Sequence, residues 1–472
     1  MPVPDYMSFT DAPIAHHDTL LGQMQRGLGR GYLNALNTPG SSDLLLQCIE
    51  HDPRWDPQLE DRQRYYARLA IELNVCPSSV AAIYRANPSY ETDVPSLAAW
   101  VLAELVARGS AEAREQISML LHSPHWQNIF SAVAEIESEY ELFILTDADL
   151  LYVSQNLDDH ELEDLIDPYD EERLERWADL SARHHRIAAS VRRRHDERMQ
   201  EHANTMPDAS MSTEALLRQI SWQTYLNTIP LLDSRRDPGS VELLIAATRS
   251  SNRFVTGAAF RVLGRQHNTT LLDKVCRALE RDPGGPTSKS TAFRPFYFRY
   301  LEGLPAFVTL PLAREWLNSP GARRMAAHRI LECHATPAER AMVEDTLSAA
   351  LEGEADYFGV YRACSMIDAL ASIADPRSTD LLERAFYQLP YCQARPRVFK
   401  ALKASGSEAG VDLGRESLWD SNDEVRELAM TLVKRAPVVA ARIREMSLDP
   451  CEYADARNAA RAWLGDSYPR VR

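Results

Sequence analysis

The residues best suited to binding chemistry in this 472-residue chain lie in the segment 293–300, which reads FRPFYFRY. Five aromatic side chains are interleaved there with two arginines. Aromatic rings and guanidinium groups stack on bases or grip peptides, and they concentrate in binding hot spots. The segment therefore predicts a local binding site, with the alternative that its rings fill the core beside a neighbouring helix. The residues that carry the binding interpretation are Phe293, Arg294, Phe296, Tyr297 and Arg299.

Other reactive residue types lack the spacing that catalysis or metal binding needs. His122 and His125 have metal-like spacing, but Pro124 interrupts any helix that would align them, and no cysteine or carboxylate cluster accompanies them. The segment 284–290 echoes a phosphate-binding loop but lacks the glycine directly before Lys289. We therefore predict no catalytic residue, no metal site and no cofactor, and a protein that is not an enzyme.

The composition is typical of a water-soluble globular protein, with 45% hydrophobic and 25% charged residues. No stretch approaches the roughly 18 uncharged apolar residues of a membrane span, so no membrane contact is expected. The first residues lack the basic and then apolar pattern of a secretory signal. The seven cysteines are dispersed without a CxxC pair, which favours reduced thiols over a disulfide framework. A cytoplasmic location is expected; the sequence does not indicate an oligomeric state.

Charge is distributed unevenly along the chain. Lysine and arginine outnumber aspartate and glutamate by 33 to 30 in residues 236–472, a net charge of +3. The remaining 19 basic and 38 acidic residues give residues 1–235 a net charge of −19, within a total of −16. An asymmetry of this size is a clue to partners or to contacts within the chain.

A repeated pattern indicates how the chain is organised. The segment 237–264 opens with DPGSVELL, an opening that returns at 375 as DPRSTDLL. Its second half, GAAFRVLG, returns as MAAHRILE from 325 and as NAARAWLG from 458. The offsets of 68 and 201 residues are close to two and six units of about 34 residues, a length typical of helical-pair repeats.

Each repeat is predicted to be a pair of helices. Pro238 suits the first turn of helix A, whose expected buried face is Val241, Leu243, Leu244 and Ile245. The run from Ser250 to Asn252 breaks and caps the chain before helix B, and Gly264 is expected to end helix B.

This layout resembles the HEAT-like repeats of the phycobilisome-lyase type, and the run from Asp423 to Arg426 looks like the start of their helix B. The resemblance covers residues 236–472 and belongs to the repeat. It implies an all-α fold, a right-handed α-solenoid of HEAT-like antiparallel helix pairs whose B helices line the concave face. It also implies that Arg426 braces a carboxylate in a neighbouring loop.

Three regions are predicted from these patterns. Residues 1–140 form an N-terminal helical region of degenerate repeats, residues 141–210 an acidic segment with a long charged helix and a linker, and residues 211–472 the HEAT-like array. The acidic segment has ten carboxylates in the eighteen residues 158–175. One hypothesis is that it covers a basic concave face of the array; the alternative is a solvated face.

The function predicted from these features is that of a non-enzymatic protein–protein interaction scaffold or adaptor. Basic side chains on the predicted B helices favour a protein partner with an acidic surface or segment. A nucleic-acid-binding protein similar to the glycosylases built on such repeats is an alternative, which the overall acidity disfavours. An accessory subunit of a lyase is another. The further predicted binding residues are Arg323, Arg324, Arg397, Lys400, Lys434, Arg435 and Arg461.

Overall fold

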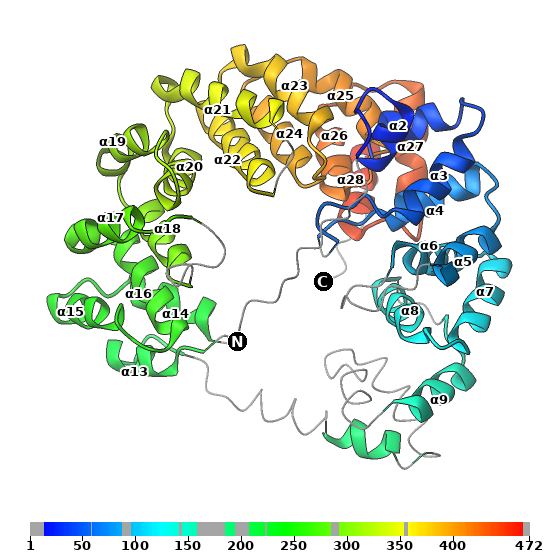
Figure 1. Ribbon diagram of the computed structural model, residues 1–472, viewed down its shortest axis with the longest axis horizontal. Coiled ribbons are helices and arrows are strands. Elements are labelled where there is room, and N and C mark those ends of the chain that lie inside the picture. Colours follow the sequence, from blue (N-terminus) through cyan, green and yellow to red (C-terminus); the bar gives the residue numbers. More distant parts are fainter. Residues whose placement is uncertain are drawn as a thin grey trace. The chain divides into compact units, whose positions relative to one another are not determined.

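The computed structural model describes residues 14–57, 59–86, 96–140, 144–157, 184, 186–193, 207–221, 224–284, 292–353 and 357–465 (Figure 1). Every regular element within these residues is a helix, which confirms the predicted all-α class. None of the helices described there combines the length and the apolar character needed to cross a membrane.

The chain divides into two compact units. Unit 1 consists of residues 1–203, 383–403 and 407–472, and unit 2 consists of residues 204–382 and 404–406. The C-terminal part of the predicted array therefore belongs to the same unit as the N-terminal region. The predicted region boundaries at residues 140 and 210 stay predictions from the sequence.

The helices of unit 2 are arranged in two rows. In the first row α14, α16, α18, α20 and α22 follow one another, each packed against the next. The second row contains α15, α17, α19 and α21, each packed against the first row. The bounds are α13 (Thr213–Gln219), α14 (Tyr225–Asp233), α15 (Pro238–Ala247), α16 (Arg253–Arg265), α17 (Leu272–Glu280), α18 (Arg294–Gly303), α19 (Ala306–Trp316), α20 (Ala322–His334), α21 (Arg340–Glu352) and α22 (Tyr357–Ile373).

Local signals in the sequence position the first clear helix pair of unit 2. The Asp237 side chain accepts a hydrogen bond from the Ser240 N–H at 2.9 Å, and Pro238 occupies the first turn of α15 as predicted. Asn252 caps α16 by accepting from the Phe254 N–H at 2.9 Å, also as predicted. The predicted buried face of α15 is wrong in part, because Leu244 is buried but Leu243 is 40% exposed.

Gly264 has a different role from the predicted one. It does not end its helix, because α16 continues to Arg265. A Cβ atom at Gly264 would lie 2.5 Å from the Tyr300 carbonyl oxygen, and one at Gly303 would lie 2.6 Å from the Gly264 carbonyl carbon. The two glycines therefore allow the backbones of α16 and α18 to touch where the helices cross.

The N-terminal helices of unit 1 also form two packed rows. One row runs from α3 through α5 and α7 to α9, and the other from α4 through α6 to α8. Helix α6 packs against helices of both rows, and all its side chains except that of Glu104 are apolar, as expected of a helix with no face to water. The bounds are α1 (Leu20–Gln25), α2 (Gly29–Ala35), α3 (Ser41–Glu50), α4 (Gln63–Glu72), α5 (Pro77–Ala86), α6 (Leu97–Ala107), α7 (Ala111–Leu121), α8 (Trp126–Tyr140) and α9 (Asp147–Asn156).

The C-terminal helices of unit 1 pack against its N-terminal helices. Helix α26 contacts α25 and α28, and α25 lies beside α2 (dark blue and orange in Figure 1). At this contact the Ser421 N–H donates to the Gly27 carbonyl at 2.9 Å. The bounds are α23 (Thr379–Gln388), which begins in unit 2, α24 (Ala394–Ala404), α25 (Ala409–Ser417), α26 (Asp423–Leu432), α27 (Pro437–Leu448) and α28 (Ala454–Leu464).

The polar contacts between these two ends of the chain are buried. The fully buried Arg62 donates to the Pro390 carbonyl at 3.3 Å and pairs with Glu60 at 3.1 Å. The same Glu60 carboxylate accepts from the Cys392 N–H at 2.6 Å. Arg26 donates to the Gln388 carbonyl at 3.1 Å. The contact is therefore specified by side chains more than 300 positions apart in the sequence.

Three features noted in the sequence lie mostly or entirely outside the described residues. The acidic segment 158–175 falls entirely outside them, as do residues 285–290 of the phosphate-loop-like segment 284–290. Of the predicted long charged helix, the structure describes a helical piece over residues 186–193.

Candidate functional site

The structure places the two arginines of the aromatic segment 293–300 differently. Arg294, at the start of α18, is buried, and its Nε and Nη2 atoms donate to the Asp282 carboxylate at 2.8 and 2.7 Å. Its Nη1 atom donates to the Gly284 carbonyl at 3.1 Å. Arg294 thus anchors the loop before α18, whereas Arg299 is exposed.

The aromatic rings of this segment are also divided. Phe296 packs against Gly257 of α16, where an added Cβ would lie 3.0 Å from the ring. The Tyr297 ring meets the Phe260 ring edge to face, with centroids 5.3 Å apart. The core-filling alternative thus suits these two residues, while Phe293 is 42% exposed.

The other predicted binding residues are distributed over both units. Arg323 and Arg324 lie on α20 in unit 2, and Arg323 pairs with Glu280 at 3.4 Å and lies over the Trp316 ring. The remaining five lie in unit 1. They are Arg397 and Lys400 on α24, Lys434 and Arg435 between α26 and α27, and Arg461 on α28.

Several of the basic residues in unit 1 have partners within the chain. Lys400 pairs with Glu424 at 2.6 Å. Arg435 donates to the Trp463 carbonyl at 2.9 Å and lies 5.0 Å above the Trp463 ring. Lys434 is exposed, and Arg397 and Arg461 are half-buried. The predicted placement of Lys434 and Arg435 on a B helix is wrong, because α26 ends at Leu432.

Unit 2 contains a cavity of about 500 Å³ between α19, α20, α21 and α22. This volume lies within the range of sites that hold a small molecule or a few side chains. Its polar wall carries three arginines, a histidine and an aspartate, and its apolar wall comes from Leu317, directly after α19, and from Met342 and Ala349 of α21. The lining residues are Arg314, Leu317, Asn318, Arg324, His328, Met342, Asp345, Thr346, Ala349 and Arg362.

The arginines of this cavity differ in how they are paired. Arg314 forms an ion pair with Glu339, whose carboxylate also accepts from Thr336 at 2.6 Å in a capping box. Within the described part of the chain, neither Arg324 nor Arg362 has a carboxylate within ion-pair distance. The cavity therefore offers two guanidinium groups that no described carboxylate neutralises.

His328 lines the same cavity and is buried in α20. Burial lowers its pKa to about 3, with smaller contributions from the positive charges of Arg362 and Arg324. The imidazole is therefore neutral near pH 7. The positive charge of the cavity comes from its arginines, and Asp345 opposes it.

Of the cavity residues, the sequence prediction included Arg324 and missed Arg314, His328 and Arg362. The spacing of Arg324 and His328, four positions apart on one helix, places both on the same face and was the local signal available. No comparable signal joins Arg314 or Arg362 to them, because each lies on another helix.

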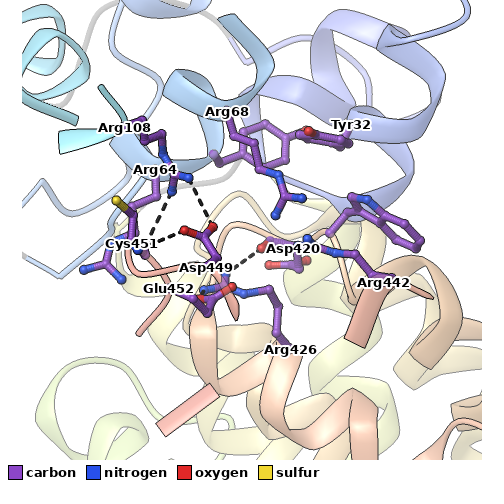
Figure 2. Close-up of a pocket in the computed structure, with 12 residues that line it drawn as sticks. Tyr32, Arg64, Arg68, Arg108, Asp420, Arg426, Arg442, Asp449, Cys451 and Glu452 are labelled. Atoms are coloured by element: carbon purple, nitrogen blue, oxygen red, sulfur yellow. Dashed lines mark hydrogen bonds and ion pairs between the residues drawn. The ribbon is translucent and has the colours of Figure 1, made fainter. Parts of the chain in front are cut away.

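Unit 1 contains a second, smaller cavity of about 30 Å³ where the N-terminal helices meet the C-terminal ones (Figure 2). Arg426 lines it and donates to the carbonyls of Asp420 and Ser421 at 2.7 and 2.9 Å. It also pairs with Glu452 in the next loop at 2.5 Å. This contact confirms the bracing role expected of Arg426, and α26 begins at Asp423 as predicted.

The histidines singled out in the sequence make contacts within the fold. The His122 ring meets the Tyr152 ring edge to face at 4.2 Å, and the His125 carbonyl accepts from the Tyr84 hydroxyl. Among the described residues, the group whose potential ligand atoms come within 4.8 Å of one another is His16, His17 and Asp18. These are consecutive residues before α1, so their adjacency in the sequence brings the atoms together without any need for a bound ligand.

No protein-family model and no curated protein matches this chain. Its function is therefore inferred from the helical architecture and from the chemistry of the unit 2 cavity.

Proposed function

We propose that this protein is a non-enzymatic interaction scaffold of the cytoplasm, a right-handed solenoid of HEAT-like helix pairs that binds an acidic segment of a protein partner. The two rows of helices in unit 2 support the repeat architecture, because each helix of the first row packs against the next helix of that row. Such arrays present extended surfaces, which suit binding better than a reaction.

The observation that carries the proposal is the arginine-lined cavity of unit 2. Arg324 and Arg362 line it, neither with a carboxylate within ion-pair distance among the described residues, and Arg314 adds a third guanidinium. Arginine pairs with a carboxylate in a two-pronged geometry that lysine cannot reproduce. An aspartate or glutamate side chain of a partner therefore fits the polar wall.

The other wall of the cavity supports a peptide better than a free anion. Leu317, Met342 and Ala349 provide apolar surface beside the arginines. A partner segment with an apolar residue next to its carboxylate would bury both groups at once. Truncating one member of a buried charge pair at an interface typically costs about 2–5 kcal/mol, so Arg324 and Arg362 are the expected hot spots.

Binding of labelled peptides to the full chain tests the proposal. We expect a peptide that alternates glutamate and leucine to bind, and its glutamine-for-glutamate counterpart to bind at least tenfold more weakly. The double variant Arg324→Gln, Arg362→Gln should lose affinity by a similar factor. Arg218→Gln is the matched control, because Arg218 is an exposed arginine of the same unit on α13. Fluorescence anisotropy measures the six combinations of the two peptides with the unaltered chain, the double variant and the control.

Two outcomes would reject this function. The first is equal binding of the acidic peptide and its neutral counterpart. The second is that single- or double-stranded nucleic acid binds more tightly than the acidic peptide, with an affinity that falls steeply with salt and depends on Arg324 and Arg362. This result would favour the nucleic-acid alternative.

A further inference from the structure

His328 is the most deeply buried residue that lines the unit 2 cavity, yet the fold gives its imidazole no hydrogen bond. The side chain is 8% exposed, and neither ring nitrogen has a hydrogen-bond partner within the described part of the chain. Buried polar groups are nearly always hydrogen-bonded, because an unpaired one loses its hydration without compensation. The partner of this imidazole therefore comes from outside the described chain.

The protonation state of His328 limits which partner suits it. Burial, and then the charges of Arg362 and Arg324, hold its pKa at about 3, so the ring is neutral near pH 7. A neutral imidazole has a lone pair on one of its two nitrogens, whereas an ionised carboxylate only accepts hydrogen bonds. A ligand that suits this lone pair therefore has an N–H or O–H donor beside its carboxylate.

The charges of the cavity fit one carboxylate. Arg314 is paired with Glu339. Of the other charged lining residues, Arg324 and Arg362 bring two positive charges and Asp345 brings one negative charge, which leaves a net charge of +1. A single carboxylate neutralises this charge, and its two oxygens match the planar guanidinium. A phosphate group carries about −1.5 to −2 near pH 7, so it would exceed the charge of the cavity beside the Asp345 carboxylate.

The apolar wall adds a third requirement. Leu317, Met342 and Ala349 line the same cavity as the arginines. In the last residue of a protein chain, the carboxylate, the N–H and the side chain are all bonded to one Cα atom. An internal glutamate instead has its carboxylate at the far end of its side chain, away from its own N–H. A terminal apolar residue therefore suits the arginines, the imidazole and the apolar wall together.

We propose that this cavity binds the free carboxyl terminus of the protein partner, with an apolar last residue. The inference rests on the proposed function, because it assigns which carboxylate of the acidic segment enters the cavity. Arg324 and Arg362 bind the terminal carboxylate, His328 accepts from the N–H of the last residue, and the apolar wall covers the last side chain. Capture of a terminal carboxylate is a recurring mode of peptide recognition.

A pair of labelled peptides tests the carboxylate on the full chain by fluorescence anisotropy. Both have one sequence that alternates glutamate and leucine and ends in leucine, with either a free terminal carboxylate or a terminal amide. We expect the free acid to bind at least tenfold more tightly. The double variant Arg324→Gln, Arg362→Gln should remove most of this difference. Arg218→Gln, at the exposed arginine of α13, should retain it.

A third peptide tests His328. An ester in place of the last peptide bond removes the N–H of the terminal residue and leaves its carboxylate and side chain. We expect the ester to bind the unaltered chain about threefold to tenfold more weakly, since one hydrogen bond typically contributes a factor of this size. His328→Leu should remove the difference between ester and free acid. His51→Leu, at an exposed histidine of unit 1, should retain it.

The outcomes separate this inference from the proposed function. Equal binding of the free acid and the amide would overturn the inference, as would a preference for the free acid that persists in the double variant, or an ester that binds as tightly as the free acid. The proposed function fails only when the amidated peptide binds no better than its amidated glutamine counterpart. If His328→Leu does not fold, the three peptides on the unaltered chain decide, because they need no variant.

Discussion

At the scale of single residues, the buried arginines of this protein act mostly on its own chain. Arg62 and Arg426 each combine backbone carbonyls with a carboxylate, and both are buried. The planar guanidinium is suited to this role because it has five donors in a rigid arrangement. The number of arginines in a repeat sequence therefore says little about a ligand until the donors already in use are known.

The pair between Arg395 and Asp420 gives a direct test at this scale. Both side chains are fully buried, and two hydrogen bonds of 2.9 and 2.7 Å join them. Arg395→Met leaves the carboxylate buried without its partner, so we expect the free energy of unfolding to fall by about 3–5 kcal/mol. Denaturant titration measures the change. Arg218→Met, at an exposed pair, should leave the midpoint nearly unchanged, and an equal effect of both variants would contradict the argument.

His328 predicts that the stability of the folded chain depends on pH. Its pKa is about 3 in the folded chain against an ordinary value of 6.5, so between these values the unfolded chain takes up a proton that the folded chain does not. Its contribution is therefore fully present above pH 6.5 and declines as the pH falls from 6.5 toward 3. The charged groups facing it are Arg324, Arg362 and Asp345.

His328→Gln should flatten the dependence of stability on pH in this window. Denaturant midpoints at a series of pH values, for the variant and for the unaltered chain, measure the difference. His51→Gln, which removes an exposed histidine of unit 1, should leave the slope unchanged. A slope in His328→Gln identical to that of the unaltered protein would show that the imidazole takes up its proton normally.

At the scale of helices, close backbone contact decides which positions must be small. Gly264 lies where α16 and α18 cross, and an added methyl group would meet the Tyr300 carbonyl oxygen at 2.5 Å. Gly264→Ala forces the helices apart, and we expect a loss of about 1–3 kcal/mol in unfolding free energy. Gly239→Ala is the control, since Gly239 is exposed in the first turn of α15 with its nearest atom at 3.5 Å.

We expect the control substitution to change the unfolding free energy in the opposite direction. Alanine restricts the unfolded chain more than glycine does, so Gly239→Ala should be neutral or stabilising by up to about 1 kcal/mol. If Gly264→Ala is as stable as the unaltered protein, the crossing has room that the backbone distances do not show.

At the scale of the whole molecule, the two ends of the chain form one unit with an unexpected distribution of charge. Residues 1–235 are strongly acidic overall, yet in the ion pairs described between the two ends they supply the arginines and the C-terminal segment supplies the carboxylates. Arg30 pairs with Glu416 at 3.2 Å, and Arg108 pairs with Asp449 at 3.1 Å. The local distribution of side chains, and not the net charge of each half, therefore determines this contact.

This arrangement predicts that two fragments cut between the units will associate. Residues 1–203 and 204–472, produced together with different tags, should copurify through the buried contacts around Arg62 and Gly29. Gly29→Ala should reduce the yield of the complex, because an added Cβ would lie 1.8 Å from the Glu416 carbonyl oxygen. Asn37→Ala, at an exposed position just after α2, is the control. Fragments that fail to copurify would show that this contact is too weak to hold without the covalent chain.

The sequence alone determined the helical class, the place of Pro238 in the first turn of α15, the cap at Asn252, and the bracing role of Arg426. These features depend on interactions within a few residues or on a repeated pattern, both of which can be read along the chain. Tertiary structure alone decided the grouping of residues 383–403 and 407–472 with the N-terminal helices and the meeting of Arg314, His328 and Arg362 at one cavity. The sequence around an arginine does not show whether its side chain faces water or a buried carboxylate. Only the packing of distant segments determines that environment.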